Sequence, residues 1–140
     1  MLGDVYKRQI FDEPFGTHGA QLAGLFNSFA FDYNVRQKLQ GLNLSDYISY
    51  QIAVPSKESV AKHTQFITTR VLELTYTAWD LEAFALDCDY DGPPFCWDEE
   101  RRFQLRCELD AAYFHLYLGA AEEWGIDNPE LREMLSLIHI

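Results

Sequence analysis

The sequence predicts a mainly α-helical protein, an α+β fragment in which a long antiparallel helical hairpin joins one N-terminal helix and one short strand. Three observations support this prediction. Apolar residues recur with helical spacing over 19–40, 66–86 and 98–118. One segment, 43–54, alternates between two faces and ends at Pro55, as a short strand does. The 140 residues are 48% hydrophobic, which is enough to bury a core, and no apolar run is long enough for a membrane helix.

The first predicted helix has an apolar stripe at positions i, i+4, i+7 and i+11, formed by Leu22, Phe26, Phe29 and Tyr33. Thr17 is placed to cap its start, and Gly41 is placed to end it. The strand that follows has no partner strand in the sequence. Because an unpaired strand leaves its backbone polar groups unsatisfied, we expect its sheet partners to lie outside this chain.

The second and third predicted helices form the hairpin. The turn Asp-Tyr-Asp-Gly-Pro-Pro-Phe at 89–95 separates them, because two prolines after a glycine cannot continue a helix. Asp98 is placed to cap the third helix, and a short final helix would begin at Pro129. Charged residues lie within the hairpin, and we interpret them as interhelical ion pairs in preference to acid–base catalysts. The acids are Glu73, Asp80, Glu82, Glu108 and Asp110, and their candidate partners are Arg70, Arg102 and Arg106.

Both ends of the sequence resemble peptides produced when a sequencing adaptor is translated as if it were coding. These segments are Asp-Val-Tyr-Lys-Arg-Gln at 4–9 and Leu-Ser-Leu-Ile-His-Ile at 135–140. Segments of this kind are excluded from reasoning about the fold. We therefore expect the natural polypeptide to span about residues 10–134, with 1–9 and 135–140 as artefacts.

Charge is spread unevenly along the chain. In total 22 acidic and 11 basic residues leave a formal net charge of −11, and an acidic protein is usually a poor nucleic-acid binder. Residues 33–70, however, contain five basic and two acidic residues, whereas residues 71–140 contain four basic and sixteen acidic ones. This asymmetry indicates an anion-facing segment beside an acidic scaffold. The odd number of cysteines, three, predicts free thiols in a reducing cytoplasm.

We find no catalytic, cofactor or metal motif in the sequence. The tetrapeptide Gly-Pro-Pro-Phe at 92–95 is similar to the (Asn/Asp/Ser)-Pro-Pro-(Tyr/Phe/Trp) motif of amino-methyltransferases. Its glycine offers no side-chain acceptor and the tetrapeptide follows a helix, so we interpret it as a turn. Cys107 lies on an apolar stripe and is expected to behave as a small hydrophobe. The spacings of Cys88, Cys96, Cys107 and His115 do not suit a structural zinc site, and no glycine-rich phosphate loop is present.

Two long runs carry a family resemblance. They are LAGLFNSFAFDYNVRQKLQGLNLSDYISYQIAVPS at 22–56 and RVLELTYTAWDLEAFALDCDYDGPPFCWDEERRFQLRCELDAAYFHLYL at 70–118. They resemble the C-terminal part of large adenine-specific DNA methyltransferases of type IIG restriction–modification and BREX-like phage-defence systems. The resemblance implies that residues 10–56 end a target-recognition region and that 57–134 form a C-terminal helical hairpin with a short helix. The segment Ile-Ala-Val-Pro at 52–55 departs from the Leu-Pro-Val-Leu-Pro-like stretch of that family.

The resemblance implies a truncated, non-catalytic fragment of a site-specific DNA N6-adenine methyltransferase. The parent protein would bind S-adenosylmethionine and carry an Asn-Pro-Pro-Tyr motif in a missing N-terminal domain, and its substrate would be double-stranded DNA. This fragment itself would hold no cofactor and would contribute to duplex recognition through phosphate contacts. The candidate DNA-binding residues are Arg36, Lys38, Lys57 and Lys62. The alternative interpretation is a helical protein-interaction or scaffold module without DNA contact.

Overall fold

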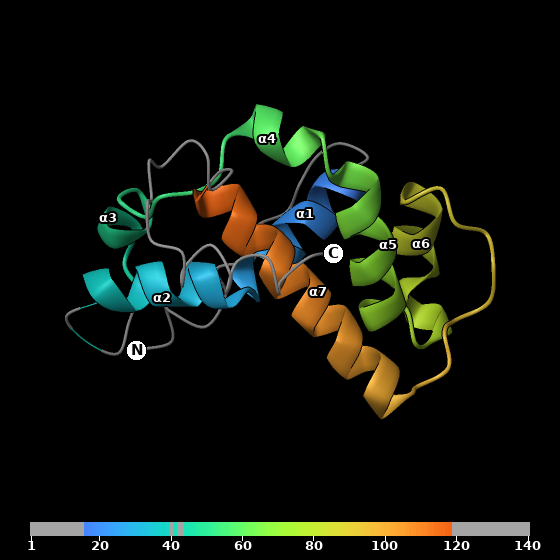
Figure 1. Ribbon diagram of the computed structural model, residues 1–140. Helices are drawn as coiled ribbons and strands as arrows, with labels where there is room; N and C mark the ends of the chain where they lie inside the picture. Colours follow the sequence, from blue (N-terminus) through green and yellow to red (C-terminus); the bar gives the residue numbers. More distant parts are fainter. Residues whose placement is uncertain (1–15, 40, 42–43, 119–140) are drawn as a thin grey trace, which may run out of the picture.

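The computed structural model describes residues 16–39, 41 and 44–118, and all the regular elements in these residues are helical (Figure 1). The prediction of a mainly α protein is confirmed. The two adaptor-like segments and the helix predicted from Pro129 lie outside the described residues. The elements are α1 (Gly16–Phe26), α2 (Phe29–Lys38), α3 (Asp46–Ser49), α4 (Lys57–Ala61), α5 (Thr64–Thr75), the 3-10 turn η1 (Trp79–Leu81), α6 (Glu82–Asp87) and α7 (Glu99–Leu118).

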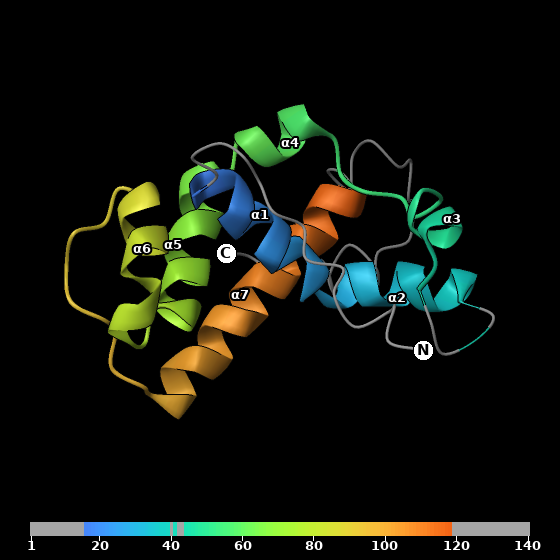
Figure 2. The same ribbon diagram turned by 180° about the vertical axis from the view of Figure 1, so that it is seen from behind.

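The main core lies where α1, α5 and α7 meet. In the view from behind, α1 lies toward the viewer and packs beside α5 (Figure 2). The Tyr113 hydroxyl of α7 donates a 2.5 Å hydrogen bond to the Gln21 carbonyl oxygen of α1, so a fully buried aromatic ring also ties two helices together. The buried residues of this core are Ala20, Leu25, Ile67, Val71, Leu109 and Tyr113.

The single helix predicted over 19–40 is wrong, because the chain forms α1 and α2 with a break at Asn27 and Ser28. Ser28 has an extended backbone, with φ −81° and ψ 146°. Its hydroxyl donates to the Leu25 carbonyl oxygen (2.8 Å) and accepts from the Phe31 N–H (3.3 Å), so one side chain helps to end α1 and to cap α2. The predicted cap Thr17 lies inside α1 instead of before it.

The strand predicted over 43–54 is also wrong within the described residues, where residues 46–49 form the short helix α3. The Ser45 hydroxyl accepts a hydrogen bond from the Ile48 N–H, and Asp46 lies in the first turn. A serine cap followed by an acid favours a helix start. The local bonds of this turn satisfy backbone groups that a lone strand would have left unpaired.

The helix predicted over 66–86 is divided. α5 ends at Thr75, Ala78 is extended, and η1 and α6 follow. The run Thr75-Tyr76-Thr77 has low helix propensity, and Tyr76 is fully buried in a second core with Leu72 and Ala85. Tertiary burial of Tyr76 therefore accompanies the end of the helix.

The third helix matches its prediction. α7 begins at Glu99, and the Asp98 carboxylate caps it by accepting a 2.7 Å hydrogen bond from the Arg101 N–H. α5 and α7 run antiparallel, because Arg70 contacts Glu108 whereas the later residue Glu73 contacts the earlier residue Arg101. The hairpin thus exists between α5 and α7, with α6 inserted before the connecting turn.

Candidate nucleic-acid interface

The four cations predicted to contact phosphate are placed by two helices. Arg36 and Lys38 lie in the last turn of α2. Lys57 is the first residue of α4, and Lys62 follows its last residue. All four side chains are exposed. Figure 1 shows α2 at the lower left and α4 at the top, so the cations form two separate pairs instead of one continuous stripe.

These cations make few contacts with the rest of the fold. Within the described residues, Lys38, Lys57 and Lys62 form no ion pair. Arg36 Nε lies 2.6 Å from Asp32 Oδ2 in an i,i+4 pair whose side chains are 72% and 50% exposed. The hydrogen bond and charge of Asp32 raise the pKa of Arg36 above its ordinary value. An exposed pair of this kind contributes little to stability, so Arg36 is available to an outside anion.

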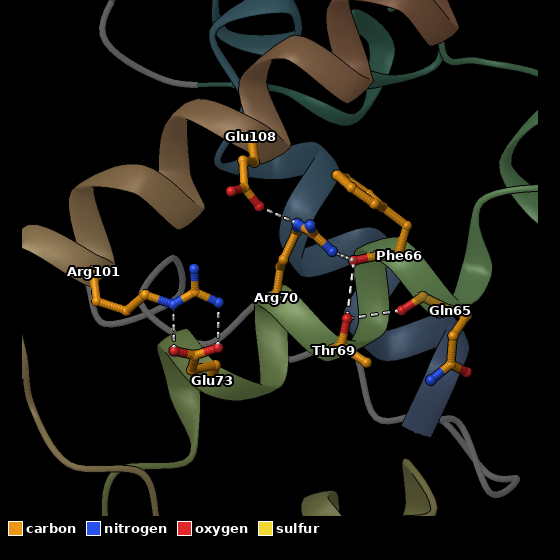
Figure 3. A network of polar contacts seen from close by, with 7 residues as sticks. All are labelled: Gln65, Phe66, Thr69, Arg70, Glu73, Arg101 and Glu108. Atoms are coloured by element: carbon orange, nitrogen blue, oxygen red, sulfur yellow. Dashed lines mark hydrogen bonds and ion pairs between the residues drawn. The ribbon is translucent and has the colours of Figure 1, made fainter. Parts of the chain in front are cut away.

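The arginines of the hairpin, in contrast, hold helices together (Figure 3). Arg70 on α5 pairs with Glu108 on α7, donates to the Phe66 carbonyl oxygen (3.1 Å) and lies 3.3 Å over the Phe66 ring. Arg101 forms a bidentate pair with Glu73, at 2.8 and 3.0 Å. The Arg70–Glu108 pair agrees with the interpretation of the hairpin charges as interhelical ion pairs, whereas Arg101, which forms the second pair, was not among the candidate partners.

Arg102 is also committed to the fold. Its guanidinium donates to the Leu74 carbonyl oxygen of α5 (2.8 Å) and lies 3.7 Å over the Trp97 ring. The Trp97 indole N–H in turn donates to Glu99 at the start of α7. Arg102 therefore links the N-terminal end of α7 to the C-terminal end of α5. It does not form the ion pair predicted for it.

A groove of about 580 Å³ lies between the α1–α2 junction, α5 and α7. Val71, Leu74 and Leu109 form much of its apolar wall. The Asp110 carboxylate at its edge accepts the Phe29 N–H (2.8 Å), and burial raises the pKa of Asp110 although this bond and the charge of Arg106 oppose the rise. Since the Asp110 acceptor serves the start of α2, the groove is an apolar surface with a structural carboxylate.

The cysteines do not form a reactive site with one another. Burial, assisted by the charges of Asp87 and Asp89, raises the pKa of Cys88 to about 11, so this thiol stays protonated near neutral pH. Cys96 and Cys107 are free and exposed. Cys107, which was expected to behave as a small hydrophobe on an apolar stripe, is instead exposed and lines the groove.

The Gly-Pro-Pro-Phe tetrapeptide is part of a structural turn. The Phe95 N–H donates to the Tyr76 carbonyl oxygen (2.8 Å), and the Phe95 ring stacks on Tyr90 with centroids 5.0 Å apart. A side chain at Gly92 would overlap the Tyr90 ring, because an added Cβ would lie 2.5 Å from it. The aromatic residue of the tetrapeptide is thus held by packing against its own turn.

Sequence reasoning missed one feature of the surface. Phe29 and Tyr33 on α2, together with Tyr47 and Tyr50 around α3, are largely exposed, although the first two had been placed on a core-facing stripe. Their periodicity indicated an apolar face, but the α2 residue Phe31 on another face packs against the core instead. Ser28 caps α2 and separates it from α1, so the two helices do not share one continuous apolar face. This cap is the sequence signal that could have shown the change of face.

In the part of the chain that the structure describes, no group of three or more His, Cys, Asp or Glu residues could hold a metal ion. No helix among those residues is long and apolar enough to cross a membrane. No protein-family model, curated protein or solved structure matches the chain.

Proposed function

We propose that this chain is a non-catalytic, C-terminal part of a site-specific DNA N6-adenine methyltransferase of a restriction–modification or phage-defence system, and that it helps to hold duplex DNA. One observation carries the DNA-binding part of this proposal. The cations of α2 and α4 are exposed and largely unused by the fold, whereas Arg70, Arg101 and Arg102 are committed to contacts between helices. The two sets of cations thus have different tasks.

The charge distribution favours one orientation toward a duplex. Among the described residues, 71–118 contain eleven acidic and three basic residues, and two of those basic residues are Arg101 and Arg102. A polyanion is repelled by this half of the chain and attracted to the end that carries α2 and α4. Phosphate contacts position a duplex without reading its sequence, so recognition of the target bases is assigned to other parts of the parent protein.

The chemistry of the proposed parent lies outside this chain. The resemblance implies a separate domain that binds S-adenosylmethionine, supplies the methyl group and carries the Asn-Pro-Pro-Tyr motif. The residues of this chain would bind and orient the DNA backbone, with no proton or methyl transfer assigned to them.

The test is duplex binding by the full chain, measured by fluorescence anisotropy between about 50 and 200 mM salt. The logarithm of the binding constant falls linearly with the logarithm of the salt concentration, and each phosphate contact contributes about 0.9 to the steepness of this slope. We expect Arg36→Ala/Lys38→Ala and Lys57→Ala/Lys62→Ala each to weaken binding and to reduce the slope by up to about 1.8. The charge-preserving variant Arg36→Lys/Lys38→Arg is the matched control and should bind like the wild type. Circular dichroism establishes that each variant is folded.

A second candidate function, a protein-interaction or scaffold module, is favoured by the apolar groove and by its exposed neighbour Phe103. It predicts that duplex affinity does not depend on Arg36 and Lys38. Wild-type affinity in Arg36→Ala/Lys38→Ala, or no duplex binding by the unaltered chain, would therefore contradict phosphate contact and favour the scaffold.

A further inference from the structure

The helix α6 and the turn η1 that leads into it share one uncovered side. The Glu82 N–H donates to the Trp79 carbonyl oxygen, a 3-10 bond that aligns side chains three residues apart. Glu82 and Leu86 follow at i and i+4 within α6, so all three residues lie on the same side. Trp79 is 62% exposed and Leu86 is 55% exposed, whereas Ala85 faces the second core and is buried. We call Trp79, Glu82 and Leu86 the α6 face.

The acids of this segment are not neutralised by the fold. Residues 79–91 contain five acidic residues and no lysine or arginine. Asp80, Glu82 and Asp87 are exposed, and their carboxylates form no hydrogen bond or ion pair within the described residues. Figures 1 and 2 both show α6 beside α5 at the end of the molecule opposite α2, so the cations of α2 lie at the other end.

The arginines of the neighbouring helices are committed elsewhere. Arg70 on α5 pairs with Glu108, and Arg101 on α7 pairs with Glu73. Burial and the charges of Asp87 and Asp89 together raise the pKa of Cys88, which is the effect of a negative potential that no cation balances. The α6 face thus combines two large apolar side chains with uncompensated negative charge.

This combination limits what the α6 face can bind. Nucleic acid and anionic lipid are repelled by its charge. Among the described residues, no group of three or more His, Cys, Asp or Glu could hold a metal ion. A second copy that presented the same face would oppose acids to acids, because a two-fold interface pairs one patch with itself. Charge complementarity therefore favours a partner that carries both cations and apolar side chains.

We propose that the α6 face binds a basic amphipathic helix of a partner protein. The apolar side of that helix covers Trp79 and Leu86, and its lysines or arginines lie against Asp80, Glu82 and Asp87. Amphipathic helices are a common means by which one protein binds another, and tryptophan is enriched among the residues that dominate binding energy. The inference goes beyond the proposed function, because it concerns the end of the molecule opposite α2 and requires no DNA.

The experiment measures the anisotropy of two labelled helical peptides, each titrated with the full chain at about 0.15 M salt. One peptide is amphipathic and built of leucine and lysine, and the other has the same charge with glutamine in place of leucine. We expect the wild type to bind the leucine–lysine peptide more tightly. Trp79→Ala/Leu86→Ala should weaken this binding by about tenfold or more and abolish the preference. Asp80→Asn/Glu82→Gln should weaken binding of both peptides and reduce its salt dependence.

Leu86→Lys serves as a second variant, because it leaves the contact of Trp79 with the buried Tyr76 in place. It adds a cation to an exposed position and should also weaken binding of the leucine–lysine peptide by about tenfold or more. Circular dichroism establishes that each variant is folded.

Two variants on other surfaces are matched controls. Phe103→Ala removes a 60% exposed phenylalanine from α7, and Glu58→Gln/Glu100→Gln removes two exposed acids outside 79–91. Both should keep the wild-type affinity for the leucine–lysine peptide. Equal losses in Glu58→Gln/Glu100→Gln and Asp80→Asn/Glu82→Gln would overturn the proposal, because the peptide would then respond only to net charge.

Equal affinity of the wild type for the two peptides would also overturn the proposal, as would unchanged affinity in Leu86→Lys. If sedimentation shows a wild-type dimer that Leu86→Lys dissociates and the leucine–lysine peptide does not, the α6 face joins two copies of the chain instead. Duplex binding is measured separately on Arg36→Ala/Lys38→Ala, which leaves the α6 face intact, so failure of either proposal is distinguishable from failure of the other.

Discussion

At the scale of single residues, Gly24 on α1 packs closely against the Tyr113 ring of α7. A Cβ added at Gly24 would lie 2.8 Å from the Tyr113 hydroxyl oxygen and 2.9 Å from a ring carbon. The Tyr113 ring cannot move away easily, because it is fully buried and its hydroxyl donates to the Gln21 carbonyl oxygen. Glycine is therefore required at position 24 for space, although its backbone is ordinary helix.

Gly19 in the same helix makes a matched comparison. A Cβ at Gly19 would meet only the Phe84 ring, at 3.8 Å, which is ordinary contact. We expect Gly24→Ala to lower the free energy of unfolding by about 1–3 kcal/mol through overpacking. Gly19→Ala should raise it by about 0.5–1 kcal/mol, because alanine is the better helix former. Urea unfolding of the full chain measures both, and two changes of the same sign would contradict this account of α1.

At the scale of elements, Ser28 defines the junction between α1 and α2. It is only 2% exposed, it bonds the end of one helix and the start of the next, and Asp110 meets the neighbouring Phe29 N–H. Ser45 caps α3 in the same way but is exposed. Loss of the Ser28 hydroxyl leaves the part-buried Phe31 N–H without its cap, although the Leu25 carbonyl oxygen still accepts from the Ser28 N–H. Water can replace the exposed Ser45 hydroxyl more easily.

Ser28→Ala should therefore lower the free energy of unfolding by about 1–2 kcal/mol, near the upper end for loss of a cap. Ser45→Ala should lower it by no more than about 0.5 kcal/mol. Urea unfolding followed by circular dichroism compares the two variants with the wild type. An equal cost at both positions would show that burial of Ser28 adds nothing to the cap.

The start of a helix could be predicted from capping residues in the sequence, whereas the side of a helix that becomes buried could not. Asp98 followed by two glutamates correctly located the start of α7. The alternation over 43–54 suggested a strand, yet the cap at Ser45 decided the structure near α3. Periodicity along α2 is present on two sides, and only packing against the rest of the molecule selects the side with Phe31 for burial. The exposed cations could be predicted from the sequence, whereas the exposure of Phe29 and Tyr33 on α2 could be seen only in the structure.

At the scale of the whole molecule, charge is separated along the chain. Residues 71–100 contain nine acidic residues and no lysine or arginine. Two ion pairs between α5 and α7 oppose the resulting repulsion, Arg70 with Glu108 and Arg101 with Glu73. The ion pairs lie at contact distance and are partly shielded, whereas repulsion among exposed acids acts over longer distances and is screened more completely by salt.

Stability of the full chain should consequently rise with moderate salt. The screening length falls from about 30 Å at 0.01 M to about 8 Å at 0.15 M salt, which removes more repulsion than attraction. We expect the midpoint of thermal unfolding to increase over this range of sodium chloride. Asp80→Asn/Asp91→Asn neutralises two exposed acids and should be more stable than the wild type at low salt, with a smaller response to added salt. A midpoint that falls as salt is added would show that the two interhelical ion pairs, and not the repulsion among the acids of 71–100, dominate the electrostatics of the fold.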